Sequence, residues 1–235
     1  MRERQADFPG VSEWSLSMQD NFELNGLKIK NMVVGMVQTN CYVLSNVKTK
    51  KAVIVDPGDQ ANVICKYLRE EGLELEGILL THGHFDHIIG VSGVLENYHV
   101  PVYAYEAEKA MLEDERLNCS VQVGNPATVI GAIYKKADET FEAAGFPVKL
   151  IATPGHTKGS CCLYFEKNEC LFSGDTLFLE SVGRTDLPTG NSRAIIESVN
   201  SLMNLPEDTY VFPGHGPATT IKYEKANNPF VENRA

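Results

Sequence analysis

The chain has 235 residues and a net charge of −10. This length suits one domain of ordinary size or two small ones, with a core that needs no disulfide staples. The acidic balance argues against a nucleic-acid partner, because a surface that binds nucleic acid needs clustered basic side chains. No stretch of the sequence reaches the roughly 20 apolar residues of a membrane-spanning helix, so we expect no membrane partner.

Residues 1–26 are polar and aperiodic, and they lack the apolar run that a signal peptide needs. We therefore interpret them as an N-terminal extension of unassigned role, followed by a single domain over residues 27–235. The six cysteines form no Cys-x-x-Cys pair, and two of them are adjacent, which fits a disulfide framework poorly. Free thiols in apolar runs predict core packing and a cytoplasmic location.

Short apolar runs bounded by Gly, Asn and Pro predict three strands at the start of the domain, over 27–35, 40–46 and 51–58. An amphipathic helix is expected next, over 61–72, and a strand that enters a polar loop over 76–84. Further along, we expect a helix at 87–98, a strand at 100–105 and a helix at 106–117.

The stretch 113–138 gives no clear element boundaries. The second half of the chain has the same kind of pattern as the first, with strands expected at 148–156, 161–167, 170–178 and 209–216 and a helix at 192–205. Mixed strands and helices in both halves predict a layered α/β domain.

Four potential metal ligands crowd into Thr81-His82-Gly83-His84-Phe85-Asp86-His87, directly after a predicted strand. Residues two apart at a strand end point to the same side, which brings His82 and His84 together. Gly83 lets the backbone bend, so that Asp86 and His87 can come round in the following turn. Imidazoles and carboxylates are ligands that zinc and other first-row metals prefer.

Three more candidates follow a glycine just past later predicted strands: His156, Asp175 and His215. The total of five histidines and two aspartates exceeds what one tetrahedral zinc takes. The count therefore predicts two metal ions, with Asp175 bridging them. His99 has no such context, and we interpret it as a surface or packing residue.

In this order, the motifs THGHFDH, PGHTKGS, SGDTLF and PGHGP resemble those of the metallo-β-lactamase superfamily, over about residues 27–230. The resemblance implies a four-layer αβ/βα sandwich with its metal site along one edge of two packed sheets. It implies one metal on His82, His84 and His156, a second on Asp86, His87 and His215, and Asp175 between them. Asp56 matches a position beside the site, where it would hold a ligand histidine or else form the turn before a helix.

Within the superfamily, Asp175 argues against the zinc β-lactamases, which commonly have Cys there or lack the bridge. His84 argues against the flavin-coupled di-iron proteins, which have Glu there, and the superfamily's nucleases carry an additional domain. The chain looks like the glyoxalase II group, the hydroxyacylglutathione hydrolases and their single-domain relatives. Arg184 aligns with a glutathione-binding Lys of that group, whereas Asp186 stands where the group has a substrate-binding Tyr.

The resemblance implies a hydrolase in which a hydroxide bridging two metals attacks a small-molecule thioester, while Asp86 orients the nucleophile and takes its proton. Zinc is the expected metal, with iron or manganese as alternatives. Arg184 or Lys158 would have to offset the acidic charge for an anionic thiol substrate.

Two alternatives stay open. A mononuclear iron persulfide dioxygenase would need only His82, His156 and Asp175 on the metal, and the Gly-Arg-Thr-Asp segment that contains Arg184 fits that reading too. A metal-binding protein without activity is the third reading. The sequence carries no signal for the oligomeric state.

Overall fold

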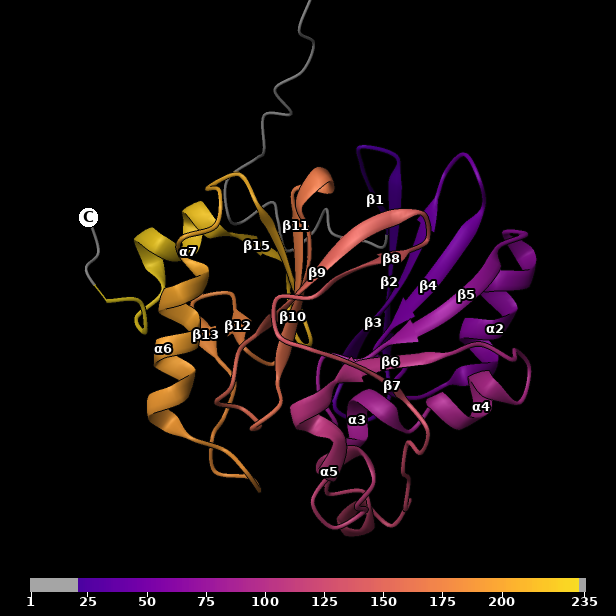
Figure 1. The fold of residues 1–235 in the computed structure, drawn as a ribbon, viewed down its shortest axis with the longest axis horizontal. Coiled ribbons are helices and arrows are strands. Elements are labelled where there is room, and N and C mark those ends of the chain that lie inside the picture. Colours follow the sequence, from indigo (N-terminus) through magenta and orange to yellow (C-terminus); the bar gives the residue numbers. More distant parts are fainter. Residues whose placement is uncertain (1–20, 233–235) are drawn as a thin grey trace, which may run out of the picture.

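Two β-sheets pack face to face, and helices cover the outer face of each sheet (Figure 1). The computed structural model describes residues 21–232. Helices α2 (Ala61–Glu70) and α4 (Val91–Leu95) lie outside the first sheet, and α6 (Ser192–Leu202) and α7 (Ile221–Asn227) lie outside the second. The predicted four-layer αβ/βα sandwich is thereby confirmed.

The first sheet has seven strands that follow one another in chain order. The four strands from β1 to β4 pair antiparallel, and those from β4 to β7 pair parallel. The strands are β1 (Asn21–Leu24), β2 (Leu27–Val34), β3 (Thr39–Asn46), β4 (Lys51–Val55), β5 (Glu74–Leu79), β6 (Val102–Tyr105) and β7 (Ile133–Lys135).

The second sheet has six strands in the order β15-β14-β11-β10-β9-β8, in which only β11 and β14 pair parallel. Its strands are β8 (Thr140–Ala143), β9 (Phe146–Ala152), β10 (Cys161–Phe165), β11 (Cys170–Gly174), β14 (Tyr210–Pro213) and β15 (Thr219–Thr220). A small hairpin of β12 (Leu177–Phe178) and β13 (Ser181–Val182) follows β11.

Three buried apolar clusters separate the four layers. Successive side chains of a strand point to opposite faces, so each central strand contributes side chains to two clusters. In β4, Ile54 packs toward α2, whereas Val53 packs between the sheets. In β11, Phe172 packs between the sheets, whereas Leu171 packs toward α6. Burial on both faces explains why these strands are continuous apolar runs rather than alternating ones.

The structure corrects several element boundaries. β1 falls inside the stretch assigned to an extension and pairs with β2, so residues 21–24 belong to the first sheet; residues 1–20 lie outside the described part. The helix expected at 87–98 is two short helices, α3 (Phe85–Ile88) and α4, which meet at Gly90. A side chain at Gly90 would lie 2.5 Å from the carbonyl oxygen of Pro57, so this corner requires glycine.

The helix expected at 106–117 is likewise shorter. It consists of the 3₁₀ turn η1 (Glu106–Glu108) followed by α5 (Lys109–Leu112). The poorly legible stretch after it contains a second 3₁₀ turn, η2 (Val121–Val123), and the short strand β7. Hydrophobic periodicity in the sequence does not predict elements as short as these.

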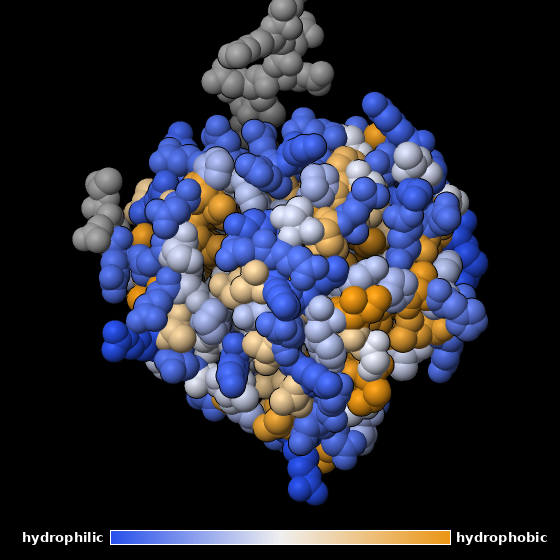
Figure 2. Space-filling view, in the orientation of Figure 1, coloured by the Kyte–Doolittle hydropathy of each residue, from blue (hydrophilic) through white to orange (hydrophobic). Residues whose placement is uncertain are grey.

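All six cysteines are free and buried, as predicted. Hydrophilic side chains cover most of the face seen in Figure 2, with hydrophobic ones in small patches between them. Among the described residues, none of the helices has the length and apolar character needed to cross a bilayer.

Candidate metal centre

Each candidate ligand follows a strand that ends at one edge of the sandwich. His82 to His87 follow β5, His156 follows β9, Asp175 follows β11 and His215 follows β14. A bridge between Thr39 and His215 links the two sheets at this edge. The carboxyl ends of parallel strands commonly form such a site, because the loops that leave them converge.

The seven predicted ligands come together as two groups with one residue between them. Donor atoms lie within 4.8 Å of one another in each group, His82, His84 and His156 in one and Asp86, His87 and His215 in the other. Asp175 faces both groups: its Oδ1 lies 3.4 Å from Nε2 of His87, and its Oδ2 lies 3.4 Å from Nε2 of His156. This is the grouping that the resemblance implied.

The donor set suits divalent metal ions. Nε2 of His82, Nε2 of His87 and Oδ1 of Asp175 are buried without a hydrogen-bond partner. An unpaired buried polar atom is costly, and coordination to a metal would satisfy all three. Burial and the neighbouring His156 lower the pKa of His84 to about 3, which keeps this imidazole in the neutral form that binds metals.

Asp56 supports a ligand rather than acting as one. Its Oδ2 accepts hydrogen bonds from Oγ1 of Thr81 at 2.6 Å and from Nδ1 of His87 at 2.9 Å, and its Oδ1 accepts from the Thr81 amide at 2.8 Å. Asp56, His82 and His87 also approach one another within 4.8 Å, but these bonds already occupy both oxygens of Asp56. The contact with Nδ1 of His87 is the geometry that the first of the two readings of Asp56 calls for.

Backbone carbonyls hold two other rings. Nδ1 of His156 lies 2.7 Å from the carbonyl oxygen of Arg184, and Nδ1 of His215 lies 3.3 Å from that of Gln38. A ring that donates from Nδ1 keeps Nε2 available as a lone pair, so these contacts fix the tautomer that can bind a metal.

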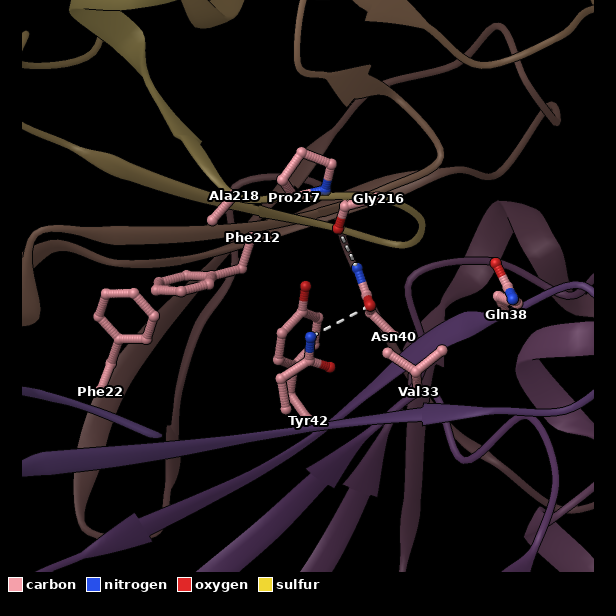
Figure 3. A pocket seen from close by; sticks show the side chains of 10 residues that line it. Phe22, Val33, Gln38, Asn40, Tyr42, Phe212, Gly216, Pro217 and Ala218 are labelled. Carbon is pink, nitrogen blue, oxygen red and sulfur yellow. Dashed lines mark hydrogen bonds between the residues drawn. The ribbon is translucent and has the colours of Figure 1, made fainter. Parts of the chain in front are cut away.

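Asn40 at the start of β3 anchors the loop that carries His215 (Figure 3). Its Nδ2 donates to the carbonyl oxygens of Pro213 at 2.9 Å and Gly216 at 2.8 Å, and its backbone amide donates to that of Gly214 at 2.7 Å. The hydroxyl of Tyr42 donates to Pro213 as well, at 2.7 Å. These bonds position His215 from the opposite sheet.

Comparison with known proteins agrees with this geometry. A family model described as "Metallo-beta-lactamase superfamily" matches residues 34–215. The chain belongs to the metallo-beta-lactamase superfamily. Within this superfamily it is 38% identical over 212 residues to "Probable metallo-hydrolase YqgX" of Bacillus subtilis, covering 87% of this chain and 98% of that protein. It is 30% identical over 213 residues to "Hydroxyacylglutathione hydrolase GloC" of Haemophilus influenzae, covering 89% of this chain and all of that one.

Two solved structures of superfamily members are similar over most of the chain. The crystal structure of BLEG-1 B3 metallo-beta-lactamase is 42% identical with a TM-score of 0.82, covering 87% of this chain and 100% of that one. The structure of TTHA1623 in a di-iron-bound form is 32% identical with a TM-score of 0.76, covering 86% and 99%. This superfamily member thus has the metallo-beta-lactamase fold and a set of candidate metal-binding His and Asp groups.

A cavity of about 390 Å³ opens onto the candidate ligands. Beside them it is lined by Val37, Phe85, Phe178, Arg184 and Leu187. Arg184 therefore lines the cavity beside the candidate ligands, and its guanidinium pairs with Asp186. Lys158 is exposed and lines a separate cavity next to Pro154, and His99 is exposed at the surface.

The sequence analysis missed Glu108. This buried carboxylate accepts one hydrogen bond from the Gly83 amide, between His82 and His84, at 2.8 Å. It accepts another from the Gly159 amide, three residues after His156, at 2.9 Å. Glu108 thus joins the two loops that carry the first ligand group. No local signal marks it, because its partners are distant in the sequence.

Proposed function

We propose that this protein is a binuclear metal-dependent hydrolase that cleaves small-molecule thioesters. The observation that carries the proposal is the position of Asp175, which faces both ligand groups. A mononuclear persulfide dioxygenase would use His82, His156 and Asp175 alone. The second group, Asp86, His87 and His215, would then coordinate no metal. The arrangement therefore favours the binuclear hydrolase.

The ligand set would hold two divalent ions. When bound, these ions would polarise the thioester carbonyl and lower the pKa of a water molecule to about 7. Nitrogen and oxygen donors accept zinc, iron and manganese, so the donor set does not select one of them. We propose zinc as the ion to test first and iron second, because a similar protein has a di-iron form.

Asp86 is suited to handle the proton of the attacking water. Its Oδ2 accepts a hydrogen bond from Oγ1 of Thr39 at 3.0 Å and lies 3.1 Å from Nε2 of His215. Burial raises the pKa of Asp86, but the His87 and His215 rings lower it more, so the carboxylate stays ionised. As water adds to the carbonyl carbon, Asp86 takes its proton. The C–S bond then breaks and the proton passes to the thiolate, giving a carboxylic acid and a thiol.

Similarity to a hydroxyacylglutathione hydrolase, over 89% of this chain, supports a thioester substrate. A second candidate is β-lactam hydrolysis, because BLEG-1 B3 metallo-beta-lactamase is 42% identical to this chain. Both reactions add water to a carbonyl carbon, and they differ in the bond that breaks. The presence of Asp175 favours the thioester reading.

The test uses the full chain loaded with two equivalents of zinc or, separately, of ferrous iron. Turnover of S-lactoylglutathione, a neutral acyl thioester, nitrocefin and glutathione persulfide is measured, together with bound metal. We expect thioester turnover, and a fall in kcat of about 10²- to 10⁴-fold in Asp86→Ala. Asp138→Ala, which removes an exposed carboxylate paired with Lys149, is the matched control and should keep full activity.

Turnover by Asp86→Ala at the rate of the unmodified protein would contradict the role given to Asp86. Nitrocefin turnover without thioester turnover would replace the thioester proposal with the β-lactam one. Oxygen uptake on the persulfide with one iron per chain would replace it with the dioxygenase.

A further inference from the structure

The candidate site has a second lobe. Beside the cavity over the ligands lies another of about 210 Å³, lined among others by Met36, Asp59 and Val123. The two cavities share Val37, Phe85 and Asp86 as lining residues. A substrate held at Asp86 can therefore extend into both lobes, one for each side of the bond that is cleaved.

Apolar side chains that face solvent are concentrated around the second lobe. Met36 is 87% exposed and Val37 48% exposed, both in the turn between β2 and β3, and Val123 of η2 is 37% exposed. Single exposed apolar residues are ordinary, but several lining the same cavity mark a surface that a ligand can cover. The lobe therefore suits an apolar group.

The two lobes offer little positive charge from side chains other than histidine. Among the described residues that line them, Arg184 is the one arginine or lysine. Its Nε and one terminal nitrogen donate to the two carboxylate oxygens of Asp186, both at 2.7 Å. The Arg184 partner lowers the pKa of Asp186 to about 2, so the pair carries no net charge near neutral pH. Asp59 adds a negative charge at the second lobe.

Resting on the proposed hydrolase function, we propose that the substrate is an uncharged thioester with an apolar acyl chain, and that the Arg184–Asp186 pair disfavours thioesters of anionic thiols such as glutathione. A carboxylate of the thiol would have to displace Asp186 from a bidentate contact and then lie beside it. The apolar acyl chain would cover Met36, Val37 and Val123.

The test compares two thioesters with the same hexanoyl group, one of N-acetylcysteamine, which is neutral, and one of glutathione, which is anionic. The zinc-loaded full chain should have at least a tenfold higher kcat/KM for the neutral one. Each methylene added to the acyl chain from acetyl to hexanoyl should raise kcat/KM by up to about fourfold. Val37→Asp should flatten this dependence on chain length.

Asp186→Asn leaves Arg184 unpaired and should shift the ratio of the two kcat/KM values toward the glutathione thioester by about threefold, the worth of an exposed ion pair. The matched control is Glu197→Gln. It removes the same charge from an exposed pair with Arg193 on α6, where the Nε–Oε1 distance is 2.8 Å. This control should leave the ratio unchanged.

A preference of the unmodified protein for the glutathione thioester would overturn this inference and leave the hydrolase proposal intact. Equal shifts in Asp186→Asn and Glu197→Gln would overturn the role given to the Arg184–Asp186 pair. Failure to hydrolyse either thioester would overturn the proposed function itself.

Discussion

Oε1 of Glu108 accepts a hydrogen bond from the backbone amide of Gly83 at 2.8 Å, across 25 positions of sequence. Its other oxygen accepts from the amide of Gly159, 51 positions away. One carboxylate therefore fixes the spacing between the loop of His82 and His84 and the loop of His156. The relationship explains why a buried acid stands next to a metal centre without touching any candidate ligand.

Glu108→Gln should weaken metal binding. A glutamine has one acceptor oxygen and one amino group, so the amino group would face the N–H of Gly83 or Gly159, donor to donor. We expect about tenfold weaker affinity for the ion on His82, His84 and His156, as for other groups that orient ligands. Zinc titration into metal-stripped protein measures it. Glu106→Gln, on the exposed side of the same turn, is the control, and equal affinities in the two variants would contradict the positioning role.

Glu108 should also make stability depend on pH. Burial raises its pKa from 4.5 to about 7, against the lowering effect of bonds from Gly83, Thr157 and Gly159. Because the pKa is higher in the folded state, its contribution to stability is complete below pH 4.5 and is lost as the pH rises through 7.

Urea unfolding of the metal-free protein between pH 4 and 8 checks this expectation. The free energy of unfolding of the unmodified protein, minus that of Glu108→Gln, should fall by about 3 kcal/mol over the range, since one pKa unit is worth about 1.4 kcal/mol. The variant cancels the contribution of the histidines, which titrate in both proteins. A difference that is flat or rises with pH would show that the pKa of Glu108 is not raised in the folded protein.

Asp56→Asn should loosen the second ligand group. Asparagine keeps one acceptor oxygen, which cannot replace both oxygens that accept from Thr81 and from Nδ1 of His87, so the fixed orientation of the His87 ring is weakened. We expect the ion on Asp86, His87 and His215 to bind about 10- to 100-fold more weakly. Competition against a zinc chelator separates the two ions. Asp59→Asn, three residues later and not a ligand neighbour, is the control and should retain both metal affinities. An equal loss of metal affinity in Asp59→Asn would show that the change acts through the loop and not through the contact between Asp56 and His87.

Gly214→Ala should displace Asp175. The added methyl group would lie 2.3 Å from Oδ1 of Asp175 and 2.7 Å from Cε1 of His87, closer than atoms can approach. We expect less than one bound ion per chain by mass spectrometry and loss of activity. Gly216→Ala is the control: it meets nothing within 4 Å and costs only the strain of its positive φ, about 1–2 kcal/mol. Two ions bound to Gly214→Ala would show that Asp175 does not bridge.

The candidate ligands could be predicted from the sequence because they follow the ends of four strands and lie in short local motifs. His82, His84, Asp86 and His87 lie within six residues, and the spacing alone suggests coordination. The layered architecture was equally legible, since long apolar strands and amphipathic helices carry their periodicity in the sequence. The short strands β7 and β1 were missed because polar residues interrupt them, whereas β6 and β14, which are four residues long, are continuous apolar runs.

Tertiary structure decided which groups face one another. Asp56 and His87 lie 31 positions apart, and their contact depends on the parallel pairing of β4 with β5. His84 and His156 lie 72 positions apart, and their contact depends on how the two sheets pack. The same holds for Glu108, which looks like one more acidic residue of a helix until β5 and β9 bring their loops to it. The sequence shows that Arg184 is a cation, but only the folded loop shows that two of its nitrogens already donate to the carboxylate of Asp186. The amino-acid sequence determines which donor atoms are present, because each donor belongs to a single residue. The electrostatic potential at the site depends on side chains that are distant in the sequence, and only packing brings those side chains together.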